Sequence, residues 1–326
     1  MSKWYFRFSY IVILTAILCL SASGGNSQTA TSYPSRPIEL IVAFAPGTGA
    51  DLSARVLVDY LAGVWKQPIK VLNVAGGAQI PGVQQLLNAK ADGYTMFLEY
   101  PSTSSMQVVQ EKMLPYKIED RTYVAMFCVQ DIIVFCNPSS PWETLKDMVK
   151  FAKEKPEEFS YAGIGGTNIA DVSTWHFLEL AGIDRTKAKR IGFTGGPQMV
   201  TAVAGGHVQF SGSPLSAAKP FIDSGKLRVL ATMAPKRLPD LPEVPTLKEL
   251  GYDCVWRIWS GISGHSNLPI EVINKWEESI KKALDDPKMR DAIKKIKADP
   301  DFLPRTEFRK MVLNEAQIVR KLFPSQ

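Results

Sequence analysis

The sequence is poor in the residues that most metal sites and many enzyme sites require. Its 326 residues include 4 cysteines and 3 histidines. The histidines, His176, His207 and His265, stand far apart, and no HExxH or paired Cys/His spacing occurs. We therefore expect no metal, and we interpret each histidine as a structural residue rather than a general base.

Motifs for nucleotide cofactors and catalytic nucleophiles are also missing. Gly47–Leu52 (GTGADL) resembles a dinucleotide-binding fingerprint, but leucine stands where the third glycine belongs. No GxxxxGK[ST] occurs, and Gly261–His265 (GISGH) does not fit the GxSxG elbow. We expect no cofactor and no catalytic constellation, so nothing here indicates an enzyme.

Long apolar runs are absent after the first 20 residues. Lys3 and Arg7 precede the apolar run Ile11–Leu20, and small residues follow at Ser21–Gly25. This order predicts a secretory signal peptide over residues 1–23. The alternative is a retained membrane anchor, which the shortness of the run disfavours. We expect a soluble protein exported to the periplasm.

Charge is scattered along the chain, and cysteines are sparse. Signal-peptide removal lowers the formal net charge from +6 to +4, because two basic residues leave with it. The basic clusters lack interleaved aromatic residues, so we expect no nucleic-acid partner. Cys128, Cys136 and Cys254 remain, an odd set in apolar runs, which predicts buried free thiols in a monomer.

What the sequence does contain is an alternation of strand-like and helix-like segments. Ile38–Phe44 reads as a buried strand, and residues 52–64 repeat apolar side chains at helical spacing. The same alternation restarts after Pro138, which predicts parallel α/β layers with covered faces. Tyr123–Phe127 and Ile132–Cys136 are predicted to be two short strands around a hairpin-like turn. Further predicted strands are Ile69–Asn73, 92–100, Phe159–Ala162, Arg190–Phe193, His207–Ser211 and Leu227–Thr232.

Most of these strands end in a loop rich in Gly, Ser and Thr that runs into a helix start. In open α/β sheets, ligands bind beyond the carboxyl ends of the strands. A helix start offers unpaired N–H groups, which suit an anion. Alternatively, each glycine only makes a tight turn. The recurrence favours a ligand site, in the loops Pro46–Gly49, Gly76–Gln79, Ser102–Ser105, Gly163–Asn168, Thr194–Gly196 and Ser211–Ser213.

Several longer segments, taken in order, resemble one receptor family. They include YPSRPIELIVAFAPGTGAD at Tyr33–Asp51, ADGYTMFLEYPS at Ala91–Ser102 and GKLRVLATMAPKRLPDLPEVPTLKELGY at Gly225–Tyr252. These segments are similar to the extracytoplasmic solute receptors of tripartite tricarboxylate transporters, the Bug or TctC-like family. The resemblance extends from Tyr33 to about Leu322.

The resemblance implies a type II periplasmic binding protein. Residues 32–131 plus 253–326 would form one α/β domain and residues 132–252 a second, joined by a two-strand hinge around a cleft. The ligand would be a small carboxylate, held mainly by backbone N–H groups and waters, with no catalysis. Membrane subunits of such a transporter are the implied partners. The alternatives are a binding protein that signals to a membrane sensor kinase, and an enzyme on the same fold.

The resemblance and the strand-end loops together select the candidate ligand-binding residues. Asp51 has two interpretations, a helix-start carboxylate or a ligand contact through water. Trp259 is either core or a lid over the ligand, and the Ser102–Ser104 segment either caps a turn or contacts the ligand. The full set is Phe44, Ala45, Gly47, Thr48, Gly49, Asp51, Gly77, Gln79, Ser102, Thr103, Gly165, Gly166, Thr167, Asn168, Asp171, Phe193, Thr194, Ser213 and Trp259.

The chain departs from the family pattern in the second set of loops. The family usually has Gly-Ser with a histidine three residues after the serine, whereas Thr167, Asn168 and Asp171 stand here. If Asp51 and Asp171 both face the cleft, their negative charges disfavour a fully ionised tricarboxylate. An acid with fewer charges, or with hydroxyl or amino donors, would then fit better. The alternative is that Asp171 turns outward as a helix cap.

Overall fold

The computed structural model describes residues 33–164, 168–193 and 196–323. The chain divides into two compact units, Met1–Ser35 and Arg36–Gln326. The predicted signal peptide lies outside the described residues. No helix in the described part of the chain is both long and apolar enough to cross a membrane.

Strands and helices alternate through most of the second unit. The strands are β1 (Ile38–Val42), β2 (Ile69–Asn73), β3 (Thr95–Glu99), β4 (Arg121–Cys136), β5 (Ser160–Gly163), β6 (Lys189–Gly192), β7 (Phe210–Pro214), β8 (Arg228–Thr232), β9 (Arg257–His265) and β10 (Asp299–Pro304). The α-helices are α2 (Gly49–Trp65), α3 (Ile80–Leu87), α4 (Leu145–Glu154), α5 (Ile169–Leu180), α6 (Gly196–Ala204), α7 (Leu215–Asp223), α8 (Ile270–Asp285), α9 (Pro287–Lys295) and α10 (Arg305–Leu322).

The strands pair in the order β2-β1-β3-β9-β4-β7-β5-β6, with β8 and β10 also on β4. Strands β1, β2 and β3 run parallel, and so do β5, β6 and β7. Loops after the strands in each set therefore meet at one carboxyl edge. The prediction of parallel α/β layers is confirmed.

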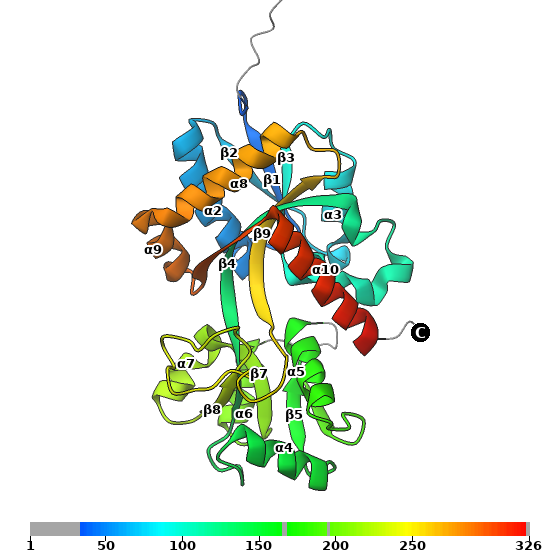
Figure 1. Ribbon diagram of the computed structural model, residues 1–326, viewed down its shortest axis with the longest axis vertical. Coiled ribbons are helices and arrows are strands. Elements are labelled where there is room, and N and C mark those ends of the chain that lie inside the picture. The colour runs from blue at the N-terminus through cyan, green and yellow to red at the C-terminus, as the bar shows by residue number, and fades with distance from the viewer. Residues whose placement is uncertain (1–32, 165–167, 194–195, 324–326) are drawn as a thin grey trace, which may run out of the picture. The chain divides into compact units, whose positions relative to one another are not determined.

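The long strand β4 connects two parts of the sheet. Its residues Arg121–Asp131 pair with β9, whereas Ile132–Cys136 pair with β7. Figure 1 shows β4 running out of the group of strands β1, β2 and β3 toward the group β5 and β7, with β9 alongside it. We call β1, β2, β3, β9, β10 and Arg121–Asp131 the first part of the sheet, and the remaining strands the second part.

The predicted hairpin between Tyr123–Phe127 and Ile132–Cys136 is wrong, because β4 is one continuous strand of 16 residues. The polar pair Gln130-Asp131 interrupts the apolar pattern in the manner of a turn. In the structure Asp131 lies opposite Arg257 on β9 and forms an ion pair with it. A charged residue inside a strand can thus be mistaken for a turn, because the local sequence does not show its ion-pair partner.

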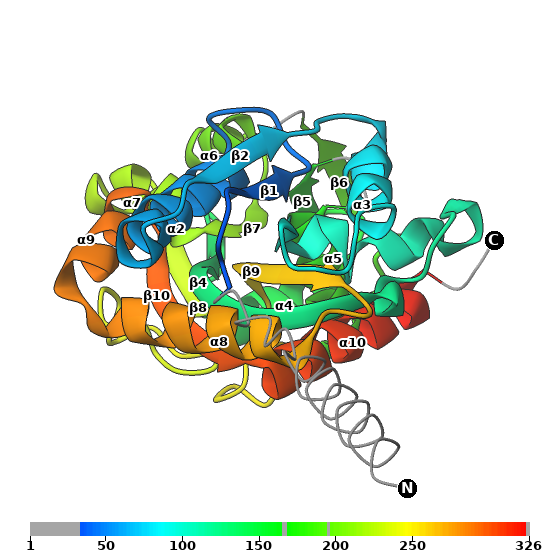
Figure 2. The ribbon, with the colours of Figure 1, turned by 90° about the horizontal axis from the view of Figure 1, so that it is seen from above.

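Helices cover the sheet and leave its carboxyl edges to the loops. α8 and α10 pack on β4 (Figure 2), and α10 contributes Phe308 and Val312 to a buried cluster with Trp259. In the second part, Phe177 of α5 packs on Phe210 of β7. These contacts fix the strand ends on which the candidate loops begin.

The three cysteines of the described residues are buried and free, as predicted. Cys128 and Cys136 lie on the same strand, so they do not face each other across a hairpin. Burial raises the pKa of the Cys128 thiol to about 12. A thiol with such a pKa is inert at neutral pH because the reactive thiolate is scarce.

Candidate ligand site

The turn between β1 and α2 exposes backbone at the end of a buried strand. Leu40, Ile41 and Val42 are fully buried, whereas Ala45–Gly49 is exposed. Gly47 has φ +83°, a conformation that residues with a side chain rarely adopt. Thr48 is the N-cap of the 17-residue helix α2. The predicted strand, glycine turn and helix start are therefore present at the residues expected.

Asp51 closes this turn from inside. It is 1% exposed and stands at the third helical position, where Oδ2 accepts the Gly47 N–H at 2.9 Å. Arg55 donates to both carboxylate oxygens at 2.9 and 3.0 Å, and Asn73 donates to Oδ1 at 2.9 Å. Burial alone raises the pKa of Asp51, but the bonds from Arg55, Gly47 and Asn73 outweigh it and hold the pKa below its usual value.

The loops after β2 and β3 lie at the same edge. Asn73, the last residue of β2, also donates to the Phe44 carbonyl oxygen at 3.0 Å. The ring of Tyr100, just after β3, packs edge-on against Phe44 with 5.3 Å between centroids. A Cβ on Gly49 would be 3.5 Å from the Tyr100 hydroxyl, so that phenol lies beside the start of α2.

The turn between β5 and α5 repeats this construction in the second part of the sheet. Asn168 is the N-cap of α5 and accepts the Ala170 N–H at 2.9 Å. Asp171, fully buried at the third helical position, accepts the Ile164 N–H at 2.7 Å. Arg190 of β6 donates to Asp171 through Nε at 3.0 Å and Nη2 at 2.8 Å.

Both aspartates are therefore buried structural residues with arginine partners. Asp171 does not turn outward as a cap, and neither carboxylate presents an uncompensated charge to a ligand. The hypothesis that Asp51 and Asp171 together repel a fully ionised acid therefore loses its premise. An ion pair of this kind is neutral overall, so anion binding at these turns is not opposed by the aspartates.

Several other predicted residues can now be placed. Gly77 is exposed and Gln79 half-buried in a turn where both have positive φ, and Phe193 is half-buried directly after β6. Ser102 is half-buried, whereas Thr103 is buried, accepts the Tyr100 N–H and donates to Glu99, which is a capping role. The predicted residues Gly165, Gly166, Thr167 and Thr194 lie outside the described residues.

Two predictions need correction. Trp259 is 1% exposed, packs edge-on against Phe308 and donates its indole N–H to Glu315, so it belongs to the core and is not a lid. Ser213 is 1% exposed and lies within β7 opposite Ile133, not in a loop. Ser213 lies where β7 continues past the predicted strand end at Ser211, whereas Trp259 lies near the start of β9.

The structure also adds site residues that the sequence analysis missed. Arg55 could have been found, because Asp and Arg four residues apart face each other on a helix. Asn73 and Tyr100 end strands whose position was predicted. Arg190 carries no such signal, since its partner is 19 residues away and on another element.

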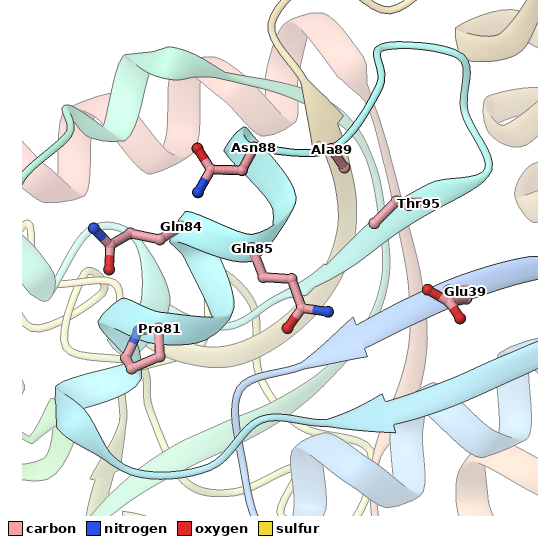
Figure 3. A pocket seen from close by; sticks show the side chains of 7 residues that line it. All are labelled: Glu39, Pro81, Gln84, Gln85, Asn88, Ala89 and Thr95. Atoms are coloured by element: carbon pink, nitrogen blue, oxygen red, sulfur yellow. The ribbon is translucent and has the colours of Figure 1, made fainter.

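A surface hollow elsewhere does not compete as a ligand site. It is lined by Gln84 and Gln85 of α3, Asn88 directly after that helix, Glu39 of β1 and Thr95 of β3 (Figure 3). Glu39 and Thr95 stand near the amino ends of their strands, away from the glycine turns. Its one charge is a carboxylate, which suits an anion poorly. No group of His, Cys, Asp and Glu within the described residues could hold a metal ion.

Comparisons with known proteins agree with this architecture. Protein BugT of Bordetella pertussis is 29% identical over 311 residues, which are 94% of each chain. A TctC solute-binding protein from Polaromonas superimposes with a TM-score of 0.81 at 24% identity, over 90% of this chain and 99% of that one. MatC from Rhodopseudomonas palustris, solved with bound malate, superimposes with a TM-score of 0.67 at 21% identity, over 89% and 100%.

The fold is therefore that of the TctC and Bug periplasmic binding proteins, as predicted from the resemblance. The family model for the tripartite tricarboxylate transporter family receptor matches residues 53–323, which is most of the chain. Members of this family are described as receptors, not as enzymes. The chain belongs to the tripartite tricarboxylate transporter receptor family, TctC.

Proposed function

We propose that this protein is a periplasmic receptor that captures a small carboxylate between the β1–α2 and β5–α5 turns and delivers it to a tripartite tricarboxylate-type membrane transporter. The observation that carries the proposal is the repeated turn. In both parts of the sheet, a parallel strand leads through a glycine-rich turn into a helix whose third residue is a buried aspartate paired with arginine.

Each turn is suited to bind an anion through backbone groups. The first intrahelical bond of α2 runs from the Leu52 N–H to the Thr48 carbonyl, and in α5 from Val172 to Asn168. Among the N–H groups before these bonds, those of Asp51 and Ala170 donate to the N-cap side chains, whereas those of Gly49 and Ala50 have no partner within α2, and the helix dipole adds positive potential there. Because the aspartates are already neutralised, this potential is available to a ligand carboxylate.

The two turns belong to different parts of the sheet, which is what a closing receptor requires. We place the domain boundary where β4 changes partners, between Asp131 and Ile132, with residues 32–131 plus 253–326 as one domain and 132–252 as the other. A ligand held by both turns would stabilise the closed arrangement, by bending at β4 and β9. The malate bound to MatC indicates the size and chemistry of a suitable ligand.

The predicted signal peptide over residues 1–23 would direct export, so the mature receptor is expected to act in the periplasm. We also expect it to be a monomer. This part of the proposal is tested by fractionation and by the mass of the mature chain. Transfer of the ligand to a transporter is tested separately, by uptake of the ligand in cells with and without the receptor gene.

The binding test starts with native mass spectrometry of the purified protein, which identifies any ligand that co-purifies. A thermal-shift panel follows, with mono-, di- and tricarboxylates, hydroxy acids and amino acids, because a bound ligand raises stability. We expect at least one small carboxylate to raise the melting temperature. If none of these acids does, and only solutes without a carboxylate do, the carboxylate proposal is wrong.

The turn itself is tested with one substitution at two positions of α2. Gly49→Val places a branched side chain at the exposed start of the helix, and we expect it to weaken binding more than tenfold. Gly63→Val is the control, because Gly63 is exposed on the same helix with open space around it. Equal affinity of the two variants would remove the β1–α2 turn from the site.

A further inference from the structure

Arg190 reaches across the end of β5 to hold Asp171. It lies on β6 in register with Tyr161 of β5, and its guanidinium passes over Gly163, where an added Cβ would be 2.9 Å from Nε. Nε and Nη2 both donate to the same oxygen of Asp171, Oδ1. The other oxygen, Oδ2, accepts the Ile164 N–H. The carboxylate therefore contacts the guanidinium along its Nε side.

This side-on pairing leaves the opposite edge of the guanidinium available. A guanidinium has five N–H groups, and the ion pair uses two of them. Within the described residues no acceptor is bonded to Nη1 of Arg190. Nη1 lies beside the end of β6, since a Cβ added to Gly192 would be 3.7 Å from it. The Arg190 side chain is 30% exposed and the Asp171 side chain 0%. A solute at these strand ends meets the cation and not the carboxylate.

Arg55 in the first part of the sheet is arranged differently. It donates Nε to Oδ2 and Nη2 to Oδ1 of Asp51, and Nη2 also donates to the Asn73 side chain at 3.3 Å. The edge of the Arg55 guanidinium formed by Nη1 and Nη2 is therefore partly occupied. Arg55 also starts one helical turn beyond Asp51 on α2, whereas Arg190 extends from a neighbouring strand.

We propose that Arg190 is a specificity-determining residue that binds a carboxylate of the ligand through Nη1 and Nη2. Two parallel N–H groups match the two oxygens of a planar carboxylate. Asp171 is then a positioning residue, which holds the guanidinium beside Gly163 and Gly192. The inference rests on the proposed function and narrows it. The ligand carries a second carboxylate, in addition to the one bound at the β1–α2 turn.

The test compares dicarboxylates with their monoamides, by titration calorimetry with succinate, malate and adipate. The variant is Asp171→Asn combined with Arg190→Gln, which replaces the ion pair with a neutral pair and leaves no unpaired buried charge. Lys189→Gln is the control, because Lys189 is an exposed cation on the same strand. Circular dichroism and thermal unfolding establish that each variant is folded.

We expect the wild-type protein and Lys189→Gln to bind at least one dicarboxylate ten- to a hundredfold more tightly than its monoamide, the effect of a charge-assisted pair. The double variant should bind the two alike, with monoamide affinity changed by less than about threefold. If the double variant does not fold, the Arg190→Lys variant is measured in its place. It keeps the charge but loses the two-pronged contact, so the preference should fall.

The inference is overturned if the wild-type protein shows no preference for the dicarboxylate, or if the folded double variant keeps that preference. Tight binding of a monocarboxylate alone would overturn this inference and leave the receptor proposal intact. Binding of no acid at all would overturn both.

Discussion

The turn after β1 and the turn after β5 hold their aspartates by different routes. In the first, Asp51 takes a backbone N–H from four residues before it and an arginine from four residues after it. In the second, Asp171 takes a backbone N–H from seven residues before it and an arginine from a neighbouring strand. The first turn is thus organised by local sequence, and the second depends on tertiary structure.

The difference has consequences for stability and for function. A local Asp–Arg pair on a helix can form as soon as the helix does. The Asp171–Arg190 pair needs β5, β6 and α5 in place, and it needs Gly163 to leave room between them. Changes in the second turn should therefore cost more than the same changes in the first.

The largest difference should come from adding one methyl group to each turn. In Gly163→Ala the new Cβ would lie 1.9 Å from Asp171 Oδ1, so the ion pair must move. Displacing a buried charge pair costs about 3 kcal/mol or more. In Gly49→Ala the nearest atom is 3.5 Å away, an ordinary contact, and we expect a change within about 0.5 kcal/mol.

Urea unfolding of the two alanine variants measures both effects. Equal losses of stability would show that the second turn relaxes as easily as the first, which would contradict the tertiary origin of its arrangement. A loss confined to Gly163→Ala would support it.

A second comparison lies between two buried glutamates, Glu99 at the end of β3 and Glu315 on α10. Glu99 has an arginine partner, Arg121, at 2.9 Å. Among the residues that the structure describes, Glu315 has no arginine partner, and it accepts hydrogen bonds from the Ser105 hydroxyl and the Trp259 indole N–H. Burial raises the pKa of Glu315 to about 7, because those two neutral donors do not replace the lost hydration of its charge.

This raised pKa predicts that stability falls as pH rises. Below pH 4 Glu315 is protonated in both the folded and the unfolded protein. Between its ordinary pKa and about 7 the unfolded chain ionises first, so the folded state loses about 1.4 kcal/mol per unit of pKa difference. Above that range the loss is complete and constant.

Glu315→Gln should remove this slope. We expect the free energy of unfolding of the variant to exceed that of the wild-type protein by an amount that grows from pH 5 to about pH 7 and is constant above it. Glu157→Gln, at an exposed position, is the control and should follow the wild type. Parallel pH curves for all three proteins would mean that Glu315 titrates normally.

Substitution of the aspartate in the first turn should have an effect of intermediate size on stability. Asp51→Asn keeps the shape of the side chain but weakens the bonds to Arg55 and Gly47, which should cost about 1–3 kcal/mol at pH 7. Because the pKa of Asp51 is lowered, its contribution is present above pH 4 and lost as pH falls below that. Unfolding at pH 7 and pH 3 measures the difference between variant and wild type. A cost that persists at pH 3 would show that its charge is not the cause.

The sequence predicts the features that depend on neighbouring residues, and it does not predict those that depend on distant partners. The β1 strand, its glycine turn and the start of α2 were predicted because apolar runs, glycine and capping residues act within a few positions. The continuous strand β4 was not, because the partner that makes Asp131 acceptable in a strand is Arg257, far away in sequence. Strand β10 was not among the predicted strands.

The candidate site divides in the same way. Residues of the first turn were placed by a local pattern, and Asp171 by alignment with the family. The role of Asp171 was misread, because its sequence context shows a carboxylate at a helix start but not the guanidinium of Arg190 above Gly163. Trp259 likewise shows its aromatic nature but not which face of β9 is covered by α10.

The smallest expected difference concerns the two N-caps. Thr48 accepts the Asp51 N–H at a long 3.4 Å, whereas Asn168 accepts the Ala170 N–H at 2.9 Å. Loss of an N-cap side chain costs about 0.5–2 kcal/mol, and the shorter bond should lie nearer the upper value. We therefore expect Asn168→Ala to destabilise more than Thr48→Ala, by about 0.5 kcal/mol. Thermal unfolding of both variants measures this difference. If Thr48→Ala destabilises the protein more than Asn168→Ala, the contacts of Asp51 alone are insufficient to hold the start of α2. The two turns would then be less alike than their geometry indicates.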